Sequence, residues 1–450
     1  MGFQQGLSGL NASSKNLDVI GNNVANAGTF GAKSARAEFA DMYASAMNGA
    51  GANSIGIGVQ LASVAQQFTQ GNITTTENSL DLAVNGSGFF QVADIYRDPN
   101  AAPTAPPQVA SPPMYSRNGQ FKLDRSGYIV NNQNQALLGY MADTNGLIAP
   151  QQARPLQLPT AGINPQATNA INLEFNLDSR AGVTQPAAGS INFTDPLTYN
   201  NATSVTVYDA KGQDVALTYY FQKTNADTWD VFATANGDTL LADGGGNPAP
   251  IATISYPPNT GGNPVAPDGS VQYYLAGGGT STDGRIPLEV PATTKADGST
   301  TLAITGLTLD MNGATQYGTT FGVTNLTQNG YAAGQLVGVT IDDSGIVMAR
   351  FSNGQSKPAA QLELATFRNP QGLQPLGGNA WAATYASGDP TLSVPGSGSM
   401  GVLQSGALEE SNVDLTAELV NMITAQRAYQ ANAQTIRTQD QVLQTLVSLR

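Results

Sequence analysis

Apolar residues recur at intervals of three and four near both ends of the chain, whereas they alternate with polar residues through most of its middle. An interval of three and four places side chains on one face of an α-helix, and alternation is typical of a half-buried β-strand. The pattern therefore predicts helices at the two ends of the sequence and β-structure between them.

The stretch 411–450 has the clearest helical pattern. After Val413 it contains neither Gly nor Pro, although the chain has 50 Gly and 25 Pro. Its first residues, Ser411-Asn412-Val413-Asp414, have the S-x-x-D form of a helix N-cap. A heptad pattern interrupted by Gln426 and Asp440 predicts one long helix with an apolar interface. The predicted interface positions are Leu415, Leu419, Met422, Tyr429, Ile436 and Leu443.

The N-terminal stretch repeats this spacing with weaker helix formers. Gly2, Gly6, Gly9 and Gly21 each disfavour a helix by about 1 kcal/mol relative to Ala, so the segment is expected to be helical only when packed. Its spacing fits an antiparallel pair that closes a monomer, and it fits equally well helices that pack on other copies of the chain. The predicted interface positions are Phe3, Leu7, Leu10, Leu17 and Val24.

Alternating segments separated by turn residues fill the middle of the chain. Leu80, Leu82 and Val84 alternate and meet Asn85-Gly86, which is a strong β-hairpin signal. Clean alternation returns at residues 215–221. These patterns predict antiparallel β domains.

Composition identifies four further stretches. Residues 34–47 are Ala-rich and predict a short helix, and residues 48–58 are Gly-rich and predict a mobile segment. Residues 97–113 are Pro-rich and predict an exposed loop. Residues 236–300 are dense in Gly, Pro and Asp and predict a loop-rich surface insertion.

The predicted fold class is α+β and multidomain. Long terminal α-helices are expected to form a coiled-coil-like inner domain, with two mainly antiparallel β domains nested inside the sequence. The expected divisions are 1–29 with 411–450 for the helical domain, 30–70 with 398–410 for a connecting segment, 71–160 with 323–397 for the first β domain, and 161–322 for the second, outer β domain.

Charge and residue usage exclude several function classes. Only 11% of residues are charged, against about 25% in an average globular protein, and the net charge is −13 without any basic cluster. This argues against nucleic-acid binding, which needs a basic surface. The sequence contains no run of about 18 apolar residues, so no membrane-inserted helix is predicted. With no Cys and no His, thiolate metal sites, Cys nucleophiles and His-based catalysis are excluded, and no cofactor is expected.

The remaining candidates for chemistry have simpler interpretations. The adjacent carboxylates Asp342-Asp343 and Glu409-Glu410 are expected in a turn and at a helix start, because sequence neighbours do not face each other on an element. Lys33 is expected to be solvated, with pairing to a neighbouring copy of the chain as the alternative, and Trp229 and Trp381 are expected in cores. An enzyme or a glycan-binding β protein that uses residues 236–300 stays a minor alternative.

Both ends of the chain resemble the bacterial flagellar rod and hook axial protein family. The resemblance lies in residues 411–415, 418–423 and 426–433 at one end and in residues 6–10 and 22–26 at the other. The family usually continues with Thr-x-Gly-aromatic-Lys, and here Ala32 replaces the aromatic residue. The resemblance covers nearly the whole chain except residues 236–300. The motif residues are Asn22, Asn23, Ala25, Asn26, Gly31, Lys33, Gln426 and Arg427.

The resemblance implies a structural, extracellular role without catalysis. Copies of the chain would assemble helically into a curved, flexible tube, a universal joint between motor and filament, with the terminal helices around an export channel. It also implies contacts with flagellar rod, hook cap and hook–filament junction proteins and passage through the flagellar type III export apparatus. The length and the segments 205–231 and 329–331 favour the hook; a distal rod or hook–filament junction protein is the alternative.

Overall fold

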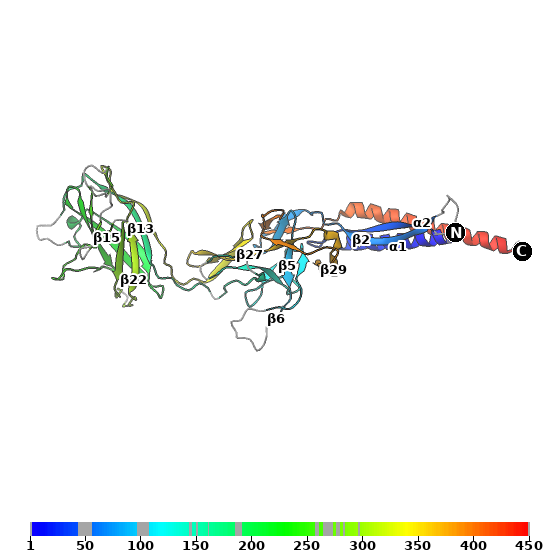
Figure 1. Ribbon diagram of the computed structural model, residues 1–450, viewed down its shortest axis with the longest axis horizontal. Helices are drawn as coiled ribbons and strands as arrows, with labels where there is room; N and C mark the ends of the chain where they lie inside the picture. Colours follow the sequence, from blue (N-terminus) through cyan, green and yellow to red (C-terminus); the bar gives the residue numbers. More distant parts are fainter. Residues whose placement is uncertain are drawn as a thin grey trace. The chain divides into compact units, whose positions relative to one another are not determined.

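The computed structural model describes residues 2–43, 56–96, 108–143, 146–149, 152–160, 162–184, 191–256, 261–263, 273–275, 280–281, 284–295 and 298–448. Contacts divide the chain into two compact units: unit 1 comprises Met1–Thr160, Val337–Arg350 and Ser356–Arg450, and unit 2 comprises Ala161–Leu336 and Phe351–Gln355. In the described part, the two α-helices are α1 (Gly2–Asn26) and α2 (Leu415–Ser448), and strands form most of the rest (Figure 1). Neither helix combines the length and hydropathy needed to span a bilayer.

The largest sheet is assembled from segments that precede and follow unit 2 in the sequence. Its strands run in the order β25-β26-β27-β11-β5-β8-β30-β29, with β9, β10, β12, β28 and β31 beside this path. Its bounds are β5 (Phe89–Ala93), β8 (Met114–Ser116), β9 (Lys122–Leu123), β10 (Ile129–Val130), β11 (Ala136–Met141), β12 (Arg154–Pro155), β25 (Leu336–Ile341), β26 (Ile346–Phe351), β27 (Ser356–Leu362), β28 (Leu364–Thr366), β29 (Gln374–Gly377), β30 (Ala380–Ala382) and β31 (Thr391–Ser393). Apolar side chains such as Phe90, Leu137 and Leu362 are fully buried against one another. Segments from before and after unit 2 therefore share one sheet and one core.

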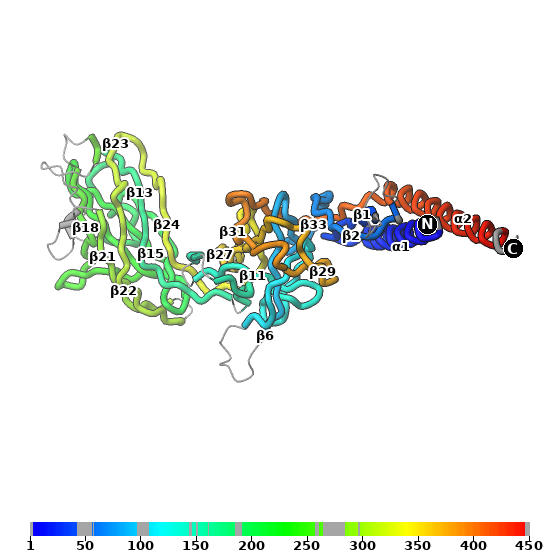
Figure 2. Tube along the Cα trace, turned by 45° about the vertical axis from the view of Figure 1, so that its right-hand side comes forward, coloured from blue at the N-terminus to red at the C-terminus, as the bar shows by residue number. Residues whose placement is uncertain are grey.

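Four short antiparallel pairs complete unit 1. They are β1 (Ala35–Tyr43) with β2 (Gly56–Gln66), β3 (Ile73–Thr75) with β33 (Ala407–Glu409), β4 (Leu82–Asn85) with β32 (Val402–Ser405), and β6 (Ile95–Tyr96) with β7 (Gln108–Val109). Two of these pairs join a segment near the N-terminus to one near the C-terminus. Figure 2 shows these early and late segments running together beside the helices.

Unit 2 is a β-sandwich whose two sheets share one core. One sheet contains β13 (Ala170–Asp178), β21 (Arg285–Val290), β22 (Ile304–Asp310), β23 (Thr315–Tyr317) and β24 (Gly322–Gln328); the other contains β14 (Asn201–Tyr208), β15 (Asp214–Asn225), β16 (Thr228–Ala235), β17 (Asp238–Thr239), β18 (Ala252–Ser255), β19 (Tyr273–Leu275) and β20 (Thr280–Ser281). Alternating residues of β15 point into the core, where the Phe221 ring lies 4.6 Å from that of Phe175. Trp229 is also fully buried here, and Trp381 is buried in unit 1, as predicted.

Residues 236–300 are not a surface insertion, and that prediction is wrong for their described part. β18, β19 and β20 extend one sheet of unit 2, and β21 forms an edge of the other. Ile251, Ile254, Ile286, Leu288 and Val290 are buried in the shared core. β18, β19 and β20 span only 4, 3 and 2 residues, which leaves too few positions to show a clear alternation. β21 does alternate, with Ile286, Leu288 and Val290 buried, but the Gly-, Pro- and Asp-rich composition around it was given more weight.

Three other predictions change. Residues 35–43 of the expected short helix form β1, because pairing with β2 and packing against α1 override the helix preference of an Ala-rich segment. Residues 44–47 of that helix, residues 48–55 of the Gly-rich stretch and residues 97–107 of the Pro-rich loop lie outside the described residues. β7 occupies residues expected in that loop, and β24, expected in the first β domain, pairs with β13 in unit 2.

The long C-terminal helix is confirmed, but its N-cap is Asp414 rather than Ser411. Asp414 Oδ1 accepts hydrogen bonds from the backbone N–H of Thr416 at 2.9 Å and of Ala417 at 3.1 Å. α2 accordingly begins at Leu415. The carboxylate also lies where the helix dipole favours a negative charge.

We expect Asp414→Ala to destabilise the start of α2 by about 1 kcal/mol, because two backbone donors lose their acceptor. Asp414→Asn should lose far less, since an amide oxygen can accept the same bonds. The measurement is amide hydrogen exchange of residues 415–419 in both variants. Equal protection in Asp414→Ala and the wild-type protein would show that the cap contributes little.

Candidate functional site

The two terminal helices pack against each other within the same chain, side by side in Figure 1. Asn23, near the end of α1, donates from Nδ2 to Glu418 Oε1 near the start of α2 at 3.3 Å. Farther along, Asn432 Nδ2 donates to Ser13 Oγ at 3.5 Å. Because residues early in α1 lie against residues late in α2, the pair is antiparallel.

Small residues form the closest contact of this helix pair. A Cβ atom added to Gly9 would lie 2.9 Å from the side-chain amide of Asn432, and one added to Gly6 would lie 3.0 Å from Ile436 Cγ1. These glycines therefore allow the close approach of the helices, which offsets the cost of placing Gly in a helix. The contact thus pairs glycines of α1 with Asn432 and Ile436 of α2.

The predicted interface positions separate into two groups. Met422 and Ile436 on α2, and Leu10, Leu17 and Val24 on α1, are half-buried in the folded chain. The others are exposed although apolar: Phe3 (47%), Leu7 (44%), Leu415 (48%), Leu419 (45%), Tyr429 (37%) and Leu443 (53%).

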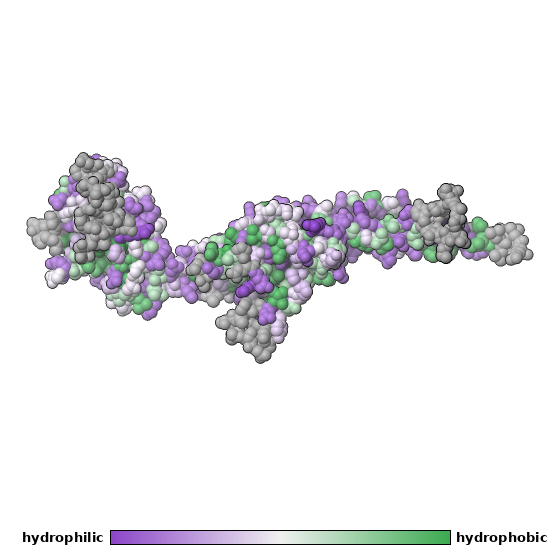
Figure 3. Space-filling view, viewed as in Figure 1, coloured by the Kyte–Doolittle hydropathy of each residue, from purple (hydrophilic) through white to green (hydrophobic). Residues whose placement is uncertain are grey.

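Three exposed residues of α2, Leu415, Leu419 and Ile423, follow one another at intervals of four and form a line that we call the outer stripe. Such spacing places the side chains on one face of the helix. Neighbouring Val420 is 58% exposed, and Val442 near the other end is 56% exposed. Ile423, Val420 and Val442 were not predicted as interface positions, although the same apolar signal was available in the sequence. Figure 3 shows apolar surface interspersed with polar surface along this helical part.

The asparagines of the N-terminal motif organise the end of α1. Asn23 is buried and makes two 2.8 Å hydrogen bonds with the backbone of Ala35, one to the carbonyl and one from the N–H. Its side chain thus attaches the first residue of β1 to the helix. Asn26 Nδ2 donates to the carbonyl of Asn22 at 2.9 Å, and Ala25 is exposed.

Gly31 has a position that no other residue can occupy without strain. Its φ is 71°, in the left-handed region, and an added Cβ would lie 2.4 Å from the backbone nitrogen of Asn118. Its own N–H donates to the backbone carbonyl of Glu409 at 2.8 Å. Gly31 therefore allows the segment after α1 to contact both strand β33 and the segment that follows β8.

Lys33, Arg117 and Glu409 form what we call the buried ion cluster. Lys33 Nζ lies 2.5 Å from Glu409 Oε1, and Arg117 Nη1 lies 3.1 Å from Glu409 Oε2. The Lys33 and Glu409 side chains are fully buried, and 6% of the Arg117 side chain is exposed. Burial lowers the pKa of both Lys33 and Arg117, and the Glu409 carboxylate opposes this shift in each.

Backbone groups complete the buried ion cluster. Lys33 Nζ also donates to the carbonyl of Thr69 at 2.8 Å, and Arg117 Nη2 donates to that of Gly86 at 2.8 Å. The N–H of Gly71 donates to Glu409 Oε1 at 3.0 Å. The expectations of a solvated Lys33 and of Glu409 at a helix start are therefore wrong, because each charge has its partner hundreds of positions away.

Arg117 was not identified from the sequence, and Asn412 was named there only as part of the motif that precedes α2. Asn412 Oδ1 accepts from the N–H of Ser34 at 2.7 Å, and its Nδ2 donates to the carbonyl of Gln67 at 2.8 Å. Asn412 thus ties the segment before α2 to both strands of the β1–β2 hairpin. The motif residues Gln426 and Arg427 are exposed on α2.

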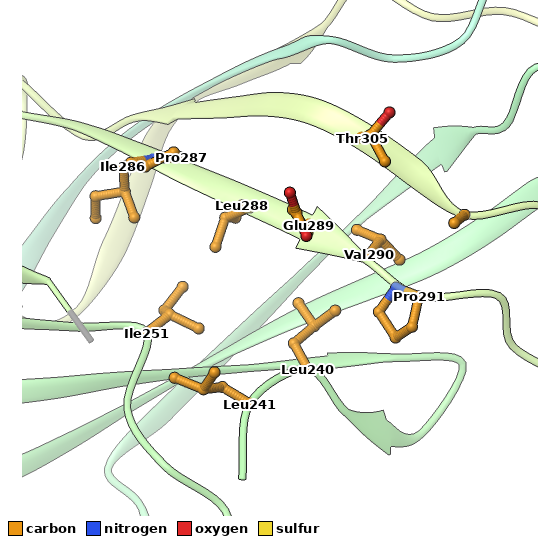
Figure 4. A pocket seen from close by; sticks show the side chains of 11 residues that line it. Leu240, Leu241, Ile251, Ile286, Pro287, Leu288, Glu289, Val290, Pro291 and Thr305 are labelled. Atoms are coloured by element: carbon orange, nitrogen blue, oxygen red, sulfur yellow. The ribbon is translucent and has the colours of Figure 1, made fainter. Parts of the chain in front are cut away.

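The described residues offer little to a catalytic interpretation. Asp342 lies in a turn, as expected, where its Oδ1 accepts from the N–H of Ile346 at 2.8 Å. No group of three or more metal-ligating side chains occurs in the described part of the chain. A cavity of about 470 Å³ in unit 2 is lined mainly by aliphatic side chains, with Leu240, Leu241 and Ile251 facing β21 (Figure 4).

Glu363, between β27 and β28, is a buried carboxyl with one unsatisfied oxygen. Tyr140 Oη donates to Oε1, whereas Oε2 has no hydrogen-bond partner. Burial raises the pKa of Glu363 above its ordinary value. A carboxyl with a raised folded-state pKa stabilises the fold below its unfolded pKa and loses this contribution as pH rises through the folded pKa.

We therefore expect Glu363→Gln to reduce the loss of stability between about pH 5 and pH 8 relative to the wild-type protein. Urea unfolding at both pH values gives the change in the free energy of unfolding for each protein. The difference between the two changes reports Glu363, because other titrating groups contribute equally to both proteins. An unchanged pH dependence in Glu363→Gln would assign the loss to other groups.

Family models match three parts of the chain. Residues 3–33 match a model described as Flagella basal body rod protein, residues 176–331 match Flagellar basal body protein FlaE D2 domain, and residues 404–449 match Flagellar basal body rod FlgEFG protein C-terminal. The terminal matches include both helices together with Lys33 and Glu409. The middle match covers most of unit 2.

Full-length relatives decide the assignment. Flagellar hook protein FlgE of Salmonella typhimurium is 39% identical over 456 residues, which cover 100% of both chains. The chain belongs to the flagellar hook protein family. The hook protein of Escherichia coli is 38% identical over 455 residues, and that of Brucella suis is 29% identical over 450 residues, each covering 100% of this chain. Membership of the hook family places the chain in the hook of the bacterial flagellum.

The hook relatives align over the entire chain, so the expected gap in the resemblance at residues 236–300 is wrong. The crystal structure of Helicobacter pylori flagellar hook protein FlgE2 aligns with a TM-score of 0.48 and 14% identity over 75% of this chain and 100% of that chain. The assignment to the hook family rests on the sequence relatives.

Proposed function

We propose that the chain is the structural subunit of a helically polymerised hook and that the exposed apolar residues of its terminal helices form the contacts between copies. The observation that carries this proposal is the composition of the two helix faces. Gly6 and Gly9 allow a close contact of α1 with Ile436 and Asn432 of α2 in the same chain, while Leu415, Leu419 and Ile423 remain exposed. Burying the exposed half of one such side chain stabilises by about 1 kcal/mol, which the free monomer does not gain.

In this proposal, helix pairs from neighbouring copies pack into a coiled-coil-like inner layer around an export channel, and the β domains lie outside it. The continuous helical layer transmits torque. Contacts between β domains form and break as the tube turns, and a chain with only 11% charged residues has few ion pairs to separate. Breaking a buried ion pair would cost several kcal/mol at each rotation.

The proposal includes further partners and a domain division. The ends of the tube meet rod, hook cap and hook–filament junction proteins, and the chain leaves the cell through the flagellar type III apparatus. It has no catalytic role. The helical domain, connecting segment and two β domains divide the subunit as their sequence patterns suggest, with β24 moved to the outer domain.

A distal rod or hook–filament junction protein is the second candidate, because the terminal matches carry rod-protein descriptions. The full-length hook relatives and the match over unit 2 favour the hook.

Expression in a bacterium that lacks its own hook gene tests the proposal. We expect electron micrographs to show curved hooks on the cell and purified chain to form tubes of the same diameter. Cells with complete rods but no hooks, together with purified chain that stays monomeric, would exclude a hook subunit.

A further inference from the structure

We infer that the buried ion cluster fixes the direction in which both terminal helices leave the β part of unit 1, and that this direction determines the geometry of the assembled tube. The inference rests on the proposed polymeric function and assigns a positioning role to Lys33, Arg117 and Glu409. Lys33 follows the last residue of α1, Asn26, by seven positions. Glu409 precedes the first residue of α2, Leu415, by six.

Glu409 connects the two helix-bearing segments through both its side chain and its backbone. Its carboxylate accepts from Lys33 Nζ, its backbone carbonyl accepts from Gly31, and both donors belong to the segment that follows α1. The residue itself ends β33, which leads into α2. One residue thus ties the two helix-bearing segments to each other.

Arg117 connects Glu409 to the β part of unit 1. Its guanidinium donates to Glu409 Oε2 at 3.1 Å and to the carbonyls of Val84 at 3.4 Å and Gly86 at 2.8 Å, at the end of β4. It also lies 5.2 Å from the centre of the Phe89 ring, at the start of β5, which favours a cation over its face. These contacts define the position of the cluster relative to two strands.

Stability alone is a weak explanation for three charges at this place. Buried ion pairs carry a large desolvation cost, and apolar replacements of similar volume are often as stable or more stable. Apolar contact is non-directional, whereas each hydrogen bond here requires a defined donor–acceptor geometry. The cluster therefore supplies orientation that an apolar core would not.

The charges of the cluster allow a selective test. The cluster contains two cations and one carboxylate, so Lys33→Met leaves a neutral Arg117–Glu409 pair with its own hydrogen bonds. This variant removes the side-chain connection between Glu409 and the segment after α1 without leaving an unpaired charge, whereas the backbone hydrogen bond from Gly31 to Glu409 remains. A second variant, Lys33→Met/Arg117→Met/Glu409→Leu, replaces the whole cluster by apolar side chains.

The experiment compares the full-length wild-type protein, both variants and a control variant. The control, Lys295→Met/Asp214→Leu, removes an ion pair of unit 2 in which Lys295 Nζ lies 2.6 Å from Asp214 Oδ1. Melting temperature reports monomer stability, and helical reconstruction by electron microscopy reports twist and rise of the tubes. We expect Lys33→Met to melt within about 4 °C of the wild-type protein, which corresponds to about 1 kcal/mol. We expect its tubes to have altered twist or at least a tenfold lower yield, while the control forms wild-type tubes.

Each outcome has a defined consequence. Wild-type twist, rise and yield in a folded Lys33→Met or apolar variant would overturn the positioning role. Loss of the monomer fold in both variants would also overturn it, because stability would then explain the cluster. Failure of the wild-type chain to form tubes would instead reject the proposed polymeric function.

Discussion

Leu419→Asp is expected to abolish tube formation while the monomer still folds. Leu419 is 45% exposed at the centre of the outer stripe, so the folded chain tolerates a charge there. In the polymer the exposed half of this side chain would also be buried, so the variant would lose about 1 kcal/mol of apolar burial at each contact, and desolvating the carboxylate would cost at least about 2 kcal/mol more. Since each 1.4 kcal/mol changes an equilibrium constant tenfold, the critical concentration for polymerisation should rise by at least about 100-fold.

The matched control is Thr435→Asp. Thr435 is also exposed on α2 but lies about 160° around the helix from Leu419, given 3.6 residues per turn. Sedimentation of polymer against concentration measures both variants, and circular dichroism checks that their monomers fold. Polymerisation of Leu419→Asp at the wild-type concentration would exclude the outer stripe from the interface.

The same substitution at Ile436 tests a different contact. Ile436 is half-buried and faces Gly6 of α1 in the same chain. Ile436→Asp should therefore loosen the α1–α2 pair, detectable as faster amide exchange in α1, in addition to any loss of polymer.

Gly31→Ala is expected to destabilise unit 1 by about 3 kcal/mol or more. A left-handed backbone costs a non-glycine residue about 1–3 kcal/mol, and forcing extra atoms into a packed site adds about as much. Both apply, because φ is 71° and the added Cβ would lie 2.4 Å from the backbone of Asn118. Urea unfolding of the full chain measures the loss.

Gly28→Ala is the control for this prediction. Gly28 lies three positions earlier in the same turn region, and an added Cβ would meet no atom within 4 Å. The substitution should leave stability unchanged or raise it slightly, because Ala restricts the unfolded chain. A similar loss of stability in both variants would mean that the turn tolerates no side chain anywhere, and the special role of Gly31 would be withdrawn.

The sequence predicted the features that depend on local periodicity. Both helices follow from apolar residues at intervals of three and four, and α1 ends at Asn26, within the stretch 1–29 assigned to the helical domain. The long strand β15 follows from the alternation between Val215 and Phe221. Each of these elements buries one face, so its apolar residues recur in the sequence with the period of a helix or a strand.

Features that depend on distant partners could not be predicted in this way. Nothing local distinguishes Lys33 from a solvated lysine, because its partner Glu409 is brought to it by the pairing of β3 with β33. Residues 35–43 have a helix-favouring composition, and only the neighbouring strand and Asn23 make them extended. The outer stripe was predicted in part, since heptad spacing does not tell which positions α1 covers.

The buried ion cluster also makes the stability of each copy depend on the presence of its C-terminal part. Lys33 and Glu409 are 376 positions apart, so a chain that ends before residue 409 contains both cations but not their carboxylate. Leaving a buried charge unpaired costs about 3–5 kcal/mol. Truncated copies would therefore have a less stable unit 1 than complete copies.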